Sequence, residues 1–150
     1  GLALFHSTAY ADSTDRKNNR ERIIRLVQRG KGVYIKSVIP SLFADEWRIA
    51  LKEKIQALID TANGYSDQGI IANIRGMMGR KGRSQILKNG GFPKLIIHGT
   101  LDSIISTEDI ELQSELNENI ELVKIESIGH MGHLEARDKT VSIFKDFCKN

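Results

Sequence analysis

The sequence Pro93-Lys94-Leu95-Ile96-Ile97-His98-Gly99, with Asp102 three residues further on, is the most informative segment of this chain. It follows the turn signal Asn89-Gly90-Gly91, and its compact run of β-branched residues predicts a central parallel strand over residues 94–98. Asp102 then lies just beyond the carboxyl end of that strand. Loops in this position carry the functional side chains of open parallel sheets, so Asp102 is a candidate site residue.

A second predicted strand is also followed by a candidate site residue, in this case a histidine. Residues 121–126 are predicted as the next strand, and Gly129-His130-Met131 follows it. Because parallel strands project their carboxyl ends to one edge of the sheet, Asp102 and His130 are expected to meet there. A carboxylate and an imidazole placed so are the acid and base of a catalytic triad.

The third member of such a triad, a nucleophile, is absent from the sequence. No Gly-x-Ser-x-Gly elbow occurs in the 150 residues, and the nearest approach, Gly82-Arg83-Ser84-Gln85-Ile86, lacks the second glycine. The chain begins abruptly on the apolar run Gly1-Leu2-Ala3-Leu4-Phe5. We therefore expect a piece of a longer protein that is inactive by itself.

Composition places the chain among ordinary globular domains. It has 150 residues, of which 40% are hydrophobic and 27% charged, enough for one domain with a core. The single cysteine, Cys148, excludes a disulfide framework and favours a reducing, cytoplasmic location. No apolar run reaches the roughly twenty residues of a membrane helix, so no membrane association is expected.

The net charge of +3 hides a segregation of charges along the chain. Residues 16–36 contain eight basic residues and residues 75–88 contain five, whereas residues 102–121 contain seven acidic residues and no basic one. The basic residues alternate with apolar ones at helical spacing and are not joined by aromatics, which favours solvated helix faces over a nucleic-acid site. A non-enzymatic module that binds an acidic ligand or partner through these helices stays open as an alternative.

The predicted elements alternate in a characteristic order. A strand over residues 2–6 precedes an almost entirely helical stretch from Thr14 to Leu87, and the remainder reads strand, helix, strand, helix. Within the helical stretch, Gly30 is expected to stop the first helix, and a short helix is expected to break before Pro40. The periodicity predicts one continuous helix over residues 45–62 and another after the capping residue Ser66.

This order resembles the C-terminal half of an α/β-hydrolase of the small bacterial esterase-like branch: the sixth strand, a helical lid, and the seventh and eighth strands. The likeness covers essentially the whole chain. It is carried by five groups of residues: Leu4-Phe5-His6-Ser7-Thr8-Ala9, Ile39-Pro40-Ser41-Leu42-Phe43, Ile74-Arg75-Gly76-Met77-Met78-Gly79-Arg80, Pro93 to Gly99 with Asp102, and Ser127-Ile128-Gly129-His130-Met131 with Leu134-Glu135.

The resemblance implies an α/β fold with three parallel strands and a four-helix lid. It divides the chain into the sixth strand (1–12), the lid (13–90) and the C-terminal core (91–150). It also implies Asp102 as the triad acid, His130 as the general base and a serine nucleophile upstream of this chain. The expected activity of the parent protein is hydrolysis of a small ester or related acyl substrate, with no cofactor and no metal.

Three residues are candidates for substrate contact. His6 ends the first strand near the expected position of the nucleophile, although a strand-end histidine bonded to nearby backbone is equally compatible. Phe43 and Met77 can face substrate from the lid, although aromatic and methionine side chains at helical spacing belong more often to a core. His133 with Glu135 resembles a metal pair only weakly, because a third ligand is missing.

The first predicted strand has a further consequence. If the fifth strand of the resembled fold is absent, the strand over residues 2–6 is left as an open apolar edge. Open edges pair with other chains. We therefore expect self-association through this edge, in addition to a small-molecule substrate as the main partner.

Overall fold

A three-stranded parallel sheet forms the centre of the computed structural model, which describes residues 1–149. The strands are β1 (Leu2–Phe5), β2 (Lys94–Gly99) and β3 (Ile120–Ile125), in the spatial order β1-β2-β3. Leu2 is in register with Lys94, and Lys94 with Ile120. The three predicted strands are confirmed, each within one residue at either end.

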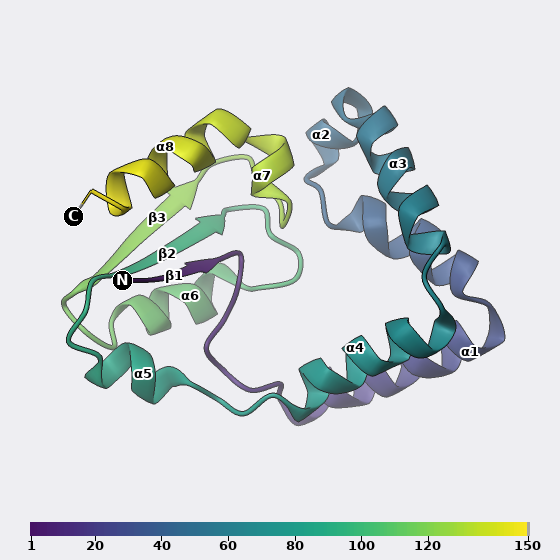
Figure 1. Ribbon diagram of the computed structural model, residues 1–150, viewed down its shortest axis with the longest axis horizontal. Coiled ribbons are helices and arrows are strands. Elements are labelled where there is room, and N and C mark those ends of the chain that lie inside the picture. The colour runs from purple at the N-terminus through teal and green to yellow at the C-terminus, as the bar shows by residue number, and fades with distance from the viewer. Residues whose placement is uncertain (150) are drawn as a thin grey trace.

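The helices fall into two groups (Figure 1). The helices α6 (Thr107–Ser114), α7 (Gly132–Glu135) and α8 (Arg137–Phe147) follow β2 and β3 and lie close to the sheet. Between β1 and β2 the chain instead leaves the sheet and forms α1 to α5. Their bounds are α1 (Thr14–Ser41), α2 (Asp45–Ala50), α3 (Lys52–Asn63), α4 (Asp67–Gly79) and α5 (Ser84–Asn89).

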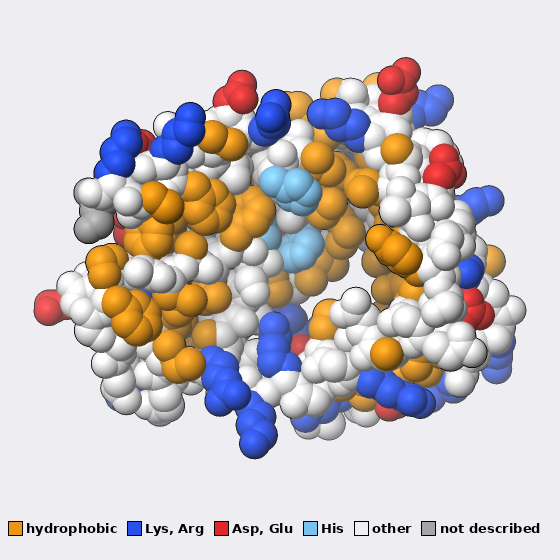
Figure 2. Space-filling view, in the orientation of Figure 1, with side chains coloured by type: hydrophobic (Ala, Val, Ile, Leu, Met, Phe, Trp, Pro, Cys, Tyr) orange, Lys and Arg blue, Asp and Glu red, His pale blue; other side chains and the backbone are white. Residues whose placement is uncertain are grey.

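Helices α1 to α4 form a helical layer beside the sheet, in which α1 packs against both α3 and α4. Serine caps begin three of the helices: the hydroxyl oxygens of Ser13, Ser66 and Ser106 accept bonds from amides at the starts of α1, α4 and α6, and of these the cap at Ser66 was predicted above. Figure 2 shows a hollow between the helical layer and the sheet, with histidine side chains on its border.

Two expectations about the helical layer were wrong in detail. No break precedes Pro40, which lies in the last turn of α1, where its missing N–H removes only one helical bond before the helix ends. The stretch 45–62 is two helices, because Leu51 leaves helical geometry (φ −107°, ψ 20°). The expected interruption at Gly30 is present, since this residue is non-helical inside α1.

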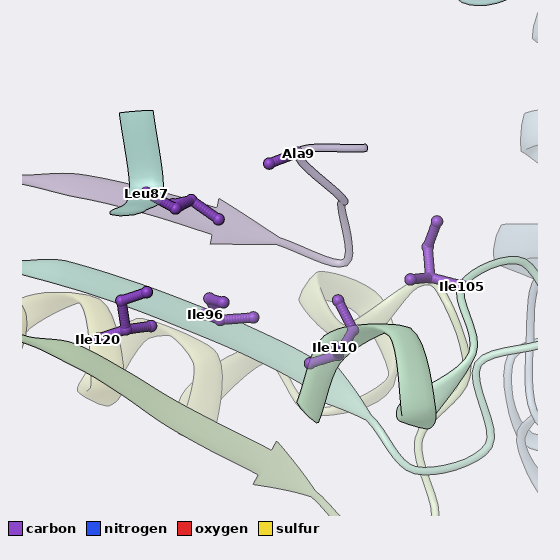
Figure 3. Packing of buried hydrophobic residues seen from close by; sticks show 6 residues of the cluster. All are labelled: Ala9, Leu87, Ile96, Ile105, Ile110 and Ile120. Atoms are coloured by element: carbon purple, nitrogen blue, oxygen red, sulfur yellow. The ribbon is translucent and has the colours of Figure 1, made fainter. Parts of the chain in front are cut away.

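Both faces of β2 are buried, which explains its apolar run Leu95-Ile96-Ile97. Ile96 faces α5 and α6 and belongs to a cluster with Ala9, Leu87, Ile105, Ile110 and Ile120 (Figure 3). Leu95 and Ile97 point to the opposite face, where they pack with Ile125, Ile128 and the aromatic side chains of α8. The strand is thereby fixed from both sides, and so is the loop that follows it.

In the described part of the chain, the search for a helix both long and apolar enough to cross a membrane finds none.

Candidate active site

Asp102 and His130 are in direct contact beyond the ends of β2 and β3. The Nδ1 atom of His130 lies 2.8 Å from Oδ2 of Asp102. The Asp102 side chain is fully buried, whereas the imidazole of His130 is 24% exposed. Within residues 1–149, no protein group is hydrogen-bonded to Nε2 of His130. The carboxylate therefore holds one ring nitrogen and leaves the other available.

The Asp102 carboxylate is also tied to its own loop. Its Oδ1 accepts hydrogen bonds from the backbone N–H of Ile104 (2.8 Å) and Ile105 (3.0 Å). Burial by itself would raise the pKa of Asp102, but the hydrogen bonds from His130, His6 and the Ile105 amide outweigh burial and hold the pKa well below its usual range. Asp102 is therefore ionised at neutral pH and favours a positive charge on a neighbouring imidazole.

His6 supplies a second imidazole to the same carboxylate. Its Nδ1 lies 3.3 Å from Oδ2 of Asp102, and the residue is only 5% exposed. Its backbone is in the left-handed region (φ 43°), which is uncommon for a residue other than glycine. A Cβ atom on Gly132 would lie 2.3 Å from Nε2 of His6, so this close approach requires glycine. His6 thus contacts the predicted acid from within the protein.

The loop that carries His130 is held by Glu135, which the sequence pattern did not identify as a site residue. The buried carboxylate accepts bonds from the backbone N–H of Ala44 (2.8 Å), Gly129 (3.1 Å) and Met131 (3.0 Å). Its three bonds join the junction between α1 and α2 to both sides of His130, which makes it a positioning residue.

Gly129 allows the same two segments to approach. A Cβ atom here would lie 2.6 Å from the Ala44 nitrogen and 2.8 Å from the Leu42 carbonyl oxygen. The next residue confirms the contact, since the His130 N–H donates to the Leu42 carbonyl at 2.7 Å. The helical layer therefore meets the sheet layer directly at the histidine.

A cavity of about 440 Å³ lies beside His130. Met77, one of the predicted substrate contacts, lines it, but Phe43 does not: that side chain is 2% exposed and packs with Ile35, Ile55 and Ile59. Ser103 also lines this cavity. Its hydroxyl donates to the Ser41 carbonyl at 2.8 Å instead of to His130, so Ser103 is not arranged as the nucleophile.

The histidines permit a limited test of metal binding. His6, His98 and Asp102 each bring one ligand atom within 4.8 Å of the others. Both Asp102 oxygens already accept hydrogen bonds, and Nε2 of His98 lies 3.0 Å from the Thr107 hydroxyl. The carboxylate of Glu135, suggested with His133 as a weak metal pair, is fully bonded to backbone N–H groups. Hydrogen bonding therefore accounts for the carboxylates of Asp102 and Glu135, whereas Nε2 of His6 and Nδ1 of His98 are buried without a hydrogen-bond partner among the described residues.

Comparison with solved structures gives close matches over 99% of the chain. An esterase from Thermogutta terrifontis, solved with malate bound, matches with a TM-score of 0.87 and 24% identity. The enol-lactonase from Burkholderia xenovorans LB400 matches with 0.85 and 17%. MGS-M2, an α/β-hydrolase enzyme from a Medee basin deep-sea metagenome library, matches with 0.82 and 18%. The chain has the α/β-hydrolase fold.

The match concerns part of that fold. The chain spans 55% of the length of each of these three α/β-hydrolase structures. No family model and no curated protein matches the sequence. At these identities the likeness establishes the fold alone, so the activity of this chain has to be argued from its own side chains.

Proposed function

We propose that Asp102 and His130 are the acid and the general base of a Ser-His-Asp triad in an enzyme that hydrolyses a small ester or related acyl compound. One observation carries the proposal: the 2.8 Å contact between Nδ1 of His130 and the buried, ionised Asp102, with Nε2 left available. The serine belongs to a part of the protein outside these 150 residues.

In this mechanism Nε2 of His130 accepts the serine proton as the oxygen attacks the acyl carbon. The resulting imidazolium is stabilised by Asp102 and returns the proton to the leaving group. Water then repeats the sequence and releases the acid. His6 and the amides of Ile104 and Ile105 keep the carboxylate in place throughout.

The remaining parts of the chain fit this role. The helical layer would act as a lid over the triad, with Met77 contacting the substrate and His6 supporting the site from below. The esterases and the enol-lactonase among the similar structures act on acyl compounds, which supports hydrolysis of an ester or lactone. No cofactor is required by this chemistry.

Labelling with a fluorophosphonate probe tests the missing nucleophile. The 150-residue chain should not be labelled and should not hydrolyse p-nitrophenyl acetate. The complete protein should do both, and His130→Ala should lower its kcat by about 10³-fold or more. Labelling of Ser103, or of any other serine in this chain, would contradict the proposal.

The alternative of a binding module that uses the basic helices receives less support. Several of the basic side chains in these two stretches, residues 16–36 and 75–88, are paired with acidic ones: Arg20 and Arg80 with Asp12, and Lys31 with Asp67. This alternative would be favoured if the chain is retained on heparin in a salt-sensitive way and the complete protein is not labelled by the fluorophosphonate probe.

We also propose that the isolated chain self-associates through β1. Within residues 1–149 this strand pairs with β2 on one side only, and its four residues are all apolar. An apolar strand with unpaired backbone groups is a template for a second strand.

A further inference from the structure

The cavity beside His130 has a basic wall. Arg16 and Arg20 of α1 line it, and no acidic side chain lines it among the described residues. Its other walls are mostly apolar and include Ile23, Val38, Met77 and Ile104. Figure 2 shows basic side chains on the border of the hollow, below the histidines. A ligand that reaches His130 therefore meets apolar surface and positive charge together.

The positive charge of Arg20 is already partly compensated by a neighbouring carboxylate. Its guanidinium is hydrogen-bonded to Asp12, whose side chain is fully buried. Arg80 lies 3.7 Å from the same carboxylate. A single negative charge is thus shared by two guanidinium groups, which leaves an excess of positive charge at this end of the cavity.

Arg16 has no carboxylate of residues 1–149 within 4.0 Å. Its Nη2 donates to the Ile104 carbonyl at 2.9 Å, and Ile104 in turn donates its N–H to Oδ1 of Asp102 at 2.8 Å. One bond to a neutral carbonyl fixes the guanidinium but leaves its charge uncompensated. The loop that follows Asp102 therefore fixes the position of Arg16 and leaves its charge available to bind an anion.

The chemistry of these walls indicates the form of the ligand. A guanidinium binds a carboxylate through two parallel hydrogen bonds, and such charge-assisted bonds are stronger in a partly buried site than in water. The apolar walls suit a short hydrocarbon chain, and His130 requires the reacting carbonyl beside it. One uncompensated guanidinium matches the single charge of a carboxylate better than the double charge of a phosphate.

We propose that the substrate is an ester or lactone whose acyl part ends in a carboxylate, and that Arg16 binds this carboxylate while the carbonyl is placed at the triad. This inference rests on the proposed hydrolase function and narrows its substrate class. Arg16 acts in substrate binding and selectivity, since the chemical step belongs to Asp102, His130 and the serine.

The test compares charged and neutral substrates of equal chain length. The complete protein is assayed with the monoethyl esters of succinic, glutaric and adipic acids and with ethyl butanoate, pentanoate and hexanoate. At one chain length or more, kcat/KM for the charged ester should exceed that of its neutral counterpart by about tenfold or more. Arg16→Met should lower kcat/KM for that charged ester by about 10- to 100-fold and change the neutral ester less than about twofold.

The matched control is Arg22→Met, which removes the same charge from an exposed position on α1 and should change neither substrate. Arg16→Lys should recover part of the selectivity, because it keeps the charge but loses the paired geometry. Circular dichroism establishes whether each variant is folded. If Arg16→Met does not fold, the comparison is made with Arg16→Lys instead.

A binding experiment separates this inference from the proposed function. Calorimetric titration of the complete protein with glutarate and adipate should show binding that Arg16→Met weakens by about tenfold or more. Hydrolysis of neutral esters without preference for charged ones, or equal binding by Arg16→Met, overturns the role of Arg16 and leaves the triad intact. If an ester that bears a phosphate is hydrolysed faster than the carboxylate-bearing esters, the proposal that the anionic group is a carboxylate is wrong. Binding without hydrolysis or probe labelling keeps the anion site and refutes the hydrolase.

Discussion

The Asp102 carboxylate is hydrogen-bonded both to the backbone of its own loop and to two histidines. Because its pKa in the folded protein is below that in the unfolded chain, the folded state binds its proton less readily. The resulting stability is fully present above the unfolded pKa of about 4 and is lost as the pH falls toward the lower folded pKa. We expect Asp102→Asn to lower the free energy of unfolding by about 2 kcal/mol at pH 7.

The difference between the two proteins should then shrink as the pH is lowered from 5 to 3, because over this range the unfolded wild-type chain takes up a proton on Asp102 while the folded protein stays ionised. Urea unfolding at several pH values measures it. Asp60→Asn, at an exposed position of α3, is the control and should show a small difference throughout. A gap between wild type and Asp102→Asn that is equal at pH 7 and pH 3 would contradict this assignment.

Glu135 has a structural role that can be separated from catalysis. Glu135→Ala leaves the N–H groups of Ala44, Gly129 and Met131 without their acceptor, and each such loss costs about 1–3 kcal/mol in a buried site. We expect a loss of about 3 kcal/mol or more in the free energy of unfolding. Glu135→Gln should lose less, because one oxygen can still accept two of these bonds.

Chemical denaturation of both variants, beside the exposed substitution Glu118→Ala, measures this effect. A loss for Glu135→Ala no larger than that for Glu118→Ala would show that the three bonds do not stabilise the loop.

Two of the three glycines of helix α4, Gly69 and Gly76, differ in their surroundings. A Cβ atom on Gly76 meets nothing within 4 Å, whereas one on Gly69 lies 3.2 Å from the capping Ser66 hydroxyl. Gly76→Ala should therefore raise the free energy of unfolding by about 0.5–1 kcal/mol through reduced entropy of the unfolded chain. Gly69→Ala should gain less, since it crowds the cap. Thermal unfolding compares the pair, and an equal or larger gain for Gly69→Ala would be the opposite result.

The elements that sequence could predict are those with strong local signals. The three strands were correct within one residue, because each contains a short group of apolar residues between polar or turn residues. The division at Leu51 was not predictable, since the apolar period of residues 45–62 continues across it and its hydrogen bonds remain helical. Proline likewise signals a helix end only approximately, and α1 extends one residue past Pro40.

The candidate site likewise contains residues that the sequence could predict and contacts that it could not. Asp102 and His130 each follow a strand, so topology alone brought them to one edge of the sheet. Other contacts at the site join segments far apart in sequence: His6 with Asp102 over 96 residues, Ala44 with Glu135 over 91, and Arg16 with Ile104 over 88. No period or spacing encodes such contacts, because they depend on how the helical layer folds back onto the sheet.

In the whole molecule, the two edges of the sheet differ in their protection. β3 carries the charged, exposed residues Glu121 and Lys124, which discourage pairing, whereas β1 is entirely apolar. Leu2 and His6 donate their N–H groups toward β2, so the alternation of a parallel strand directs the N–H of Ala3 to the open side. Any association of the isolated chain should therefore use β1.

Light scattering over a range of chain concentrations should show a rise from monomer to dimer or larger species. Ala3→Pro removes the outward N–H without taking a bond from β2, and should shift this rise to concentrations at least about tenfold higher. Ile49→Lys is the control for unspecific hydrophobic contact, because Ile49 is 86% exposed on α2, and it should leave the association unchanged. Monomers at every concentration would refute the open edge as an interface, and an equal effect of both variants would place the contact elsewhere.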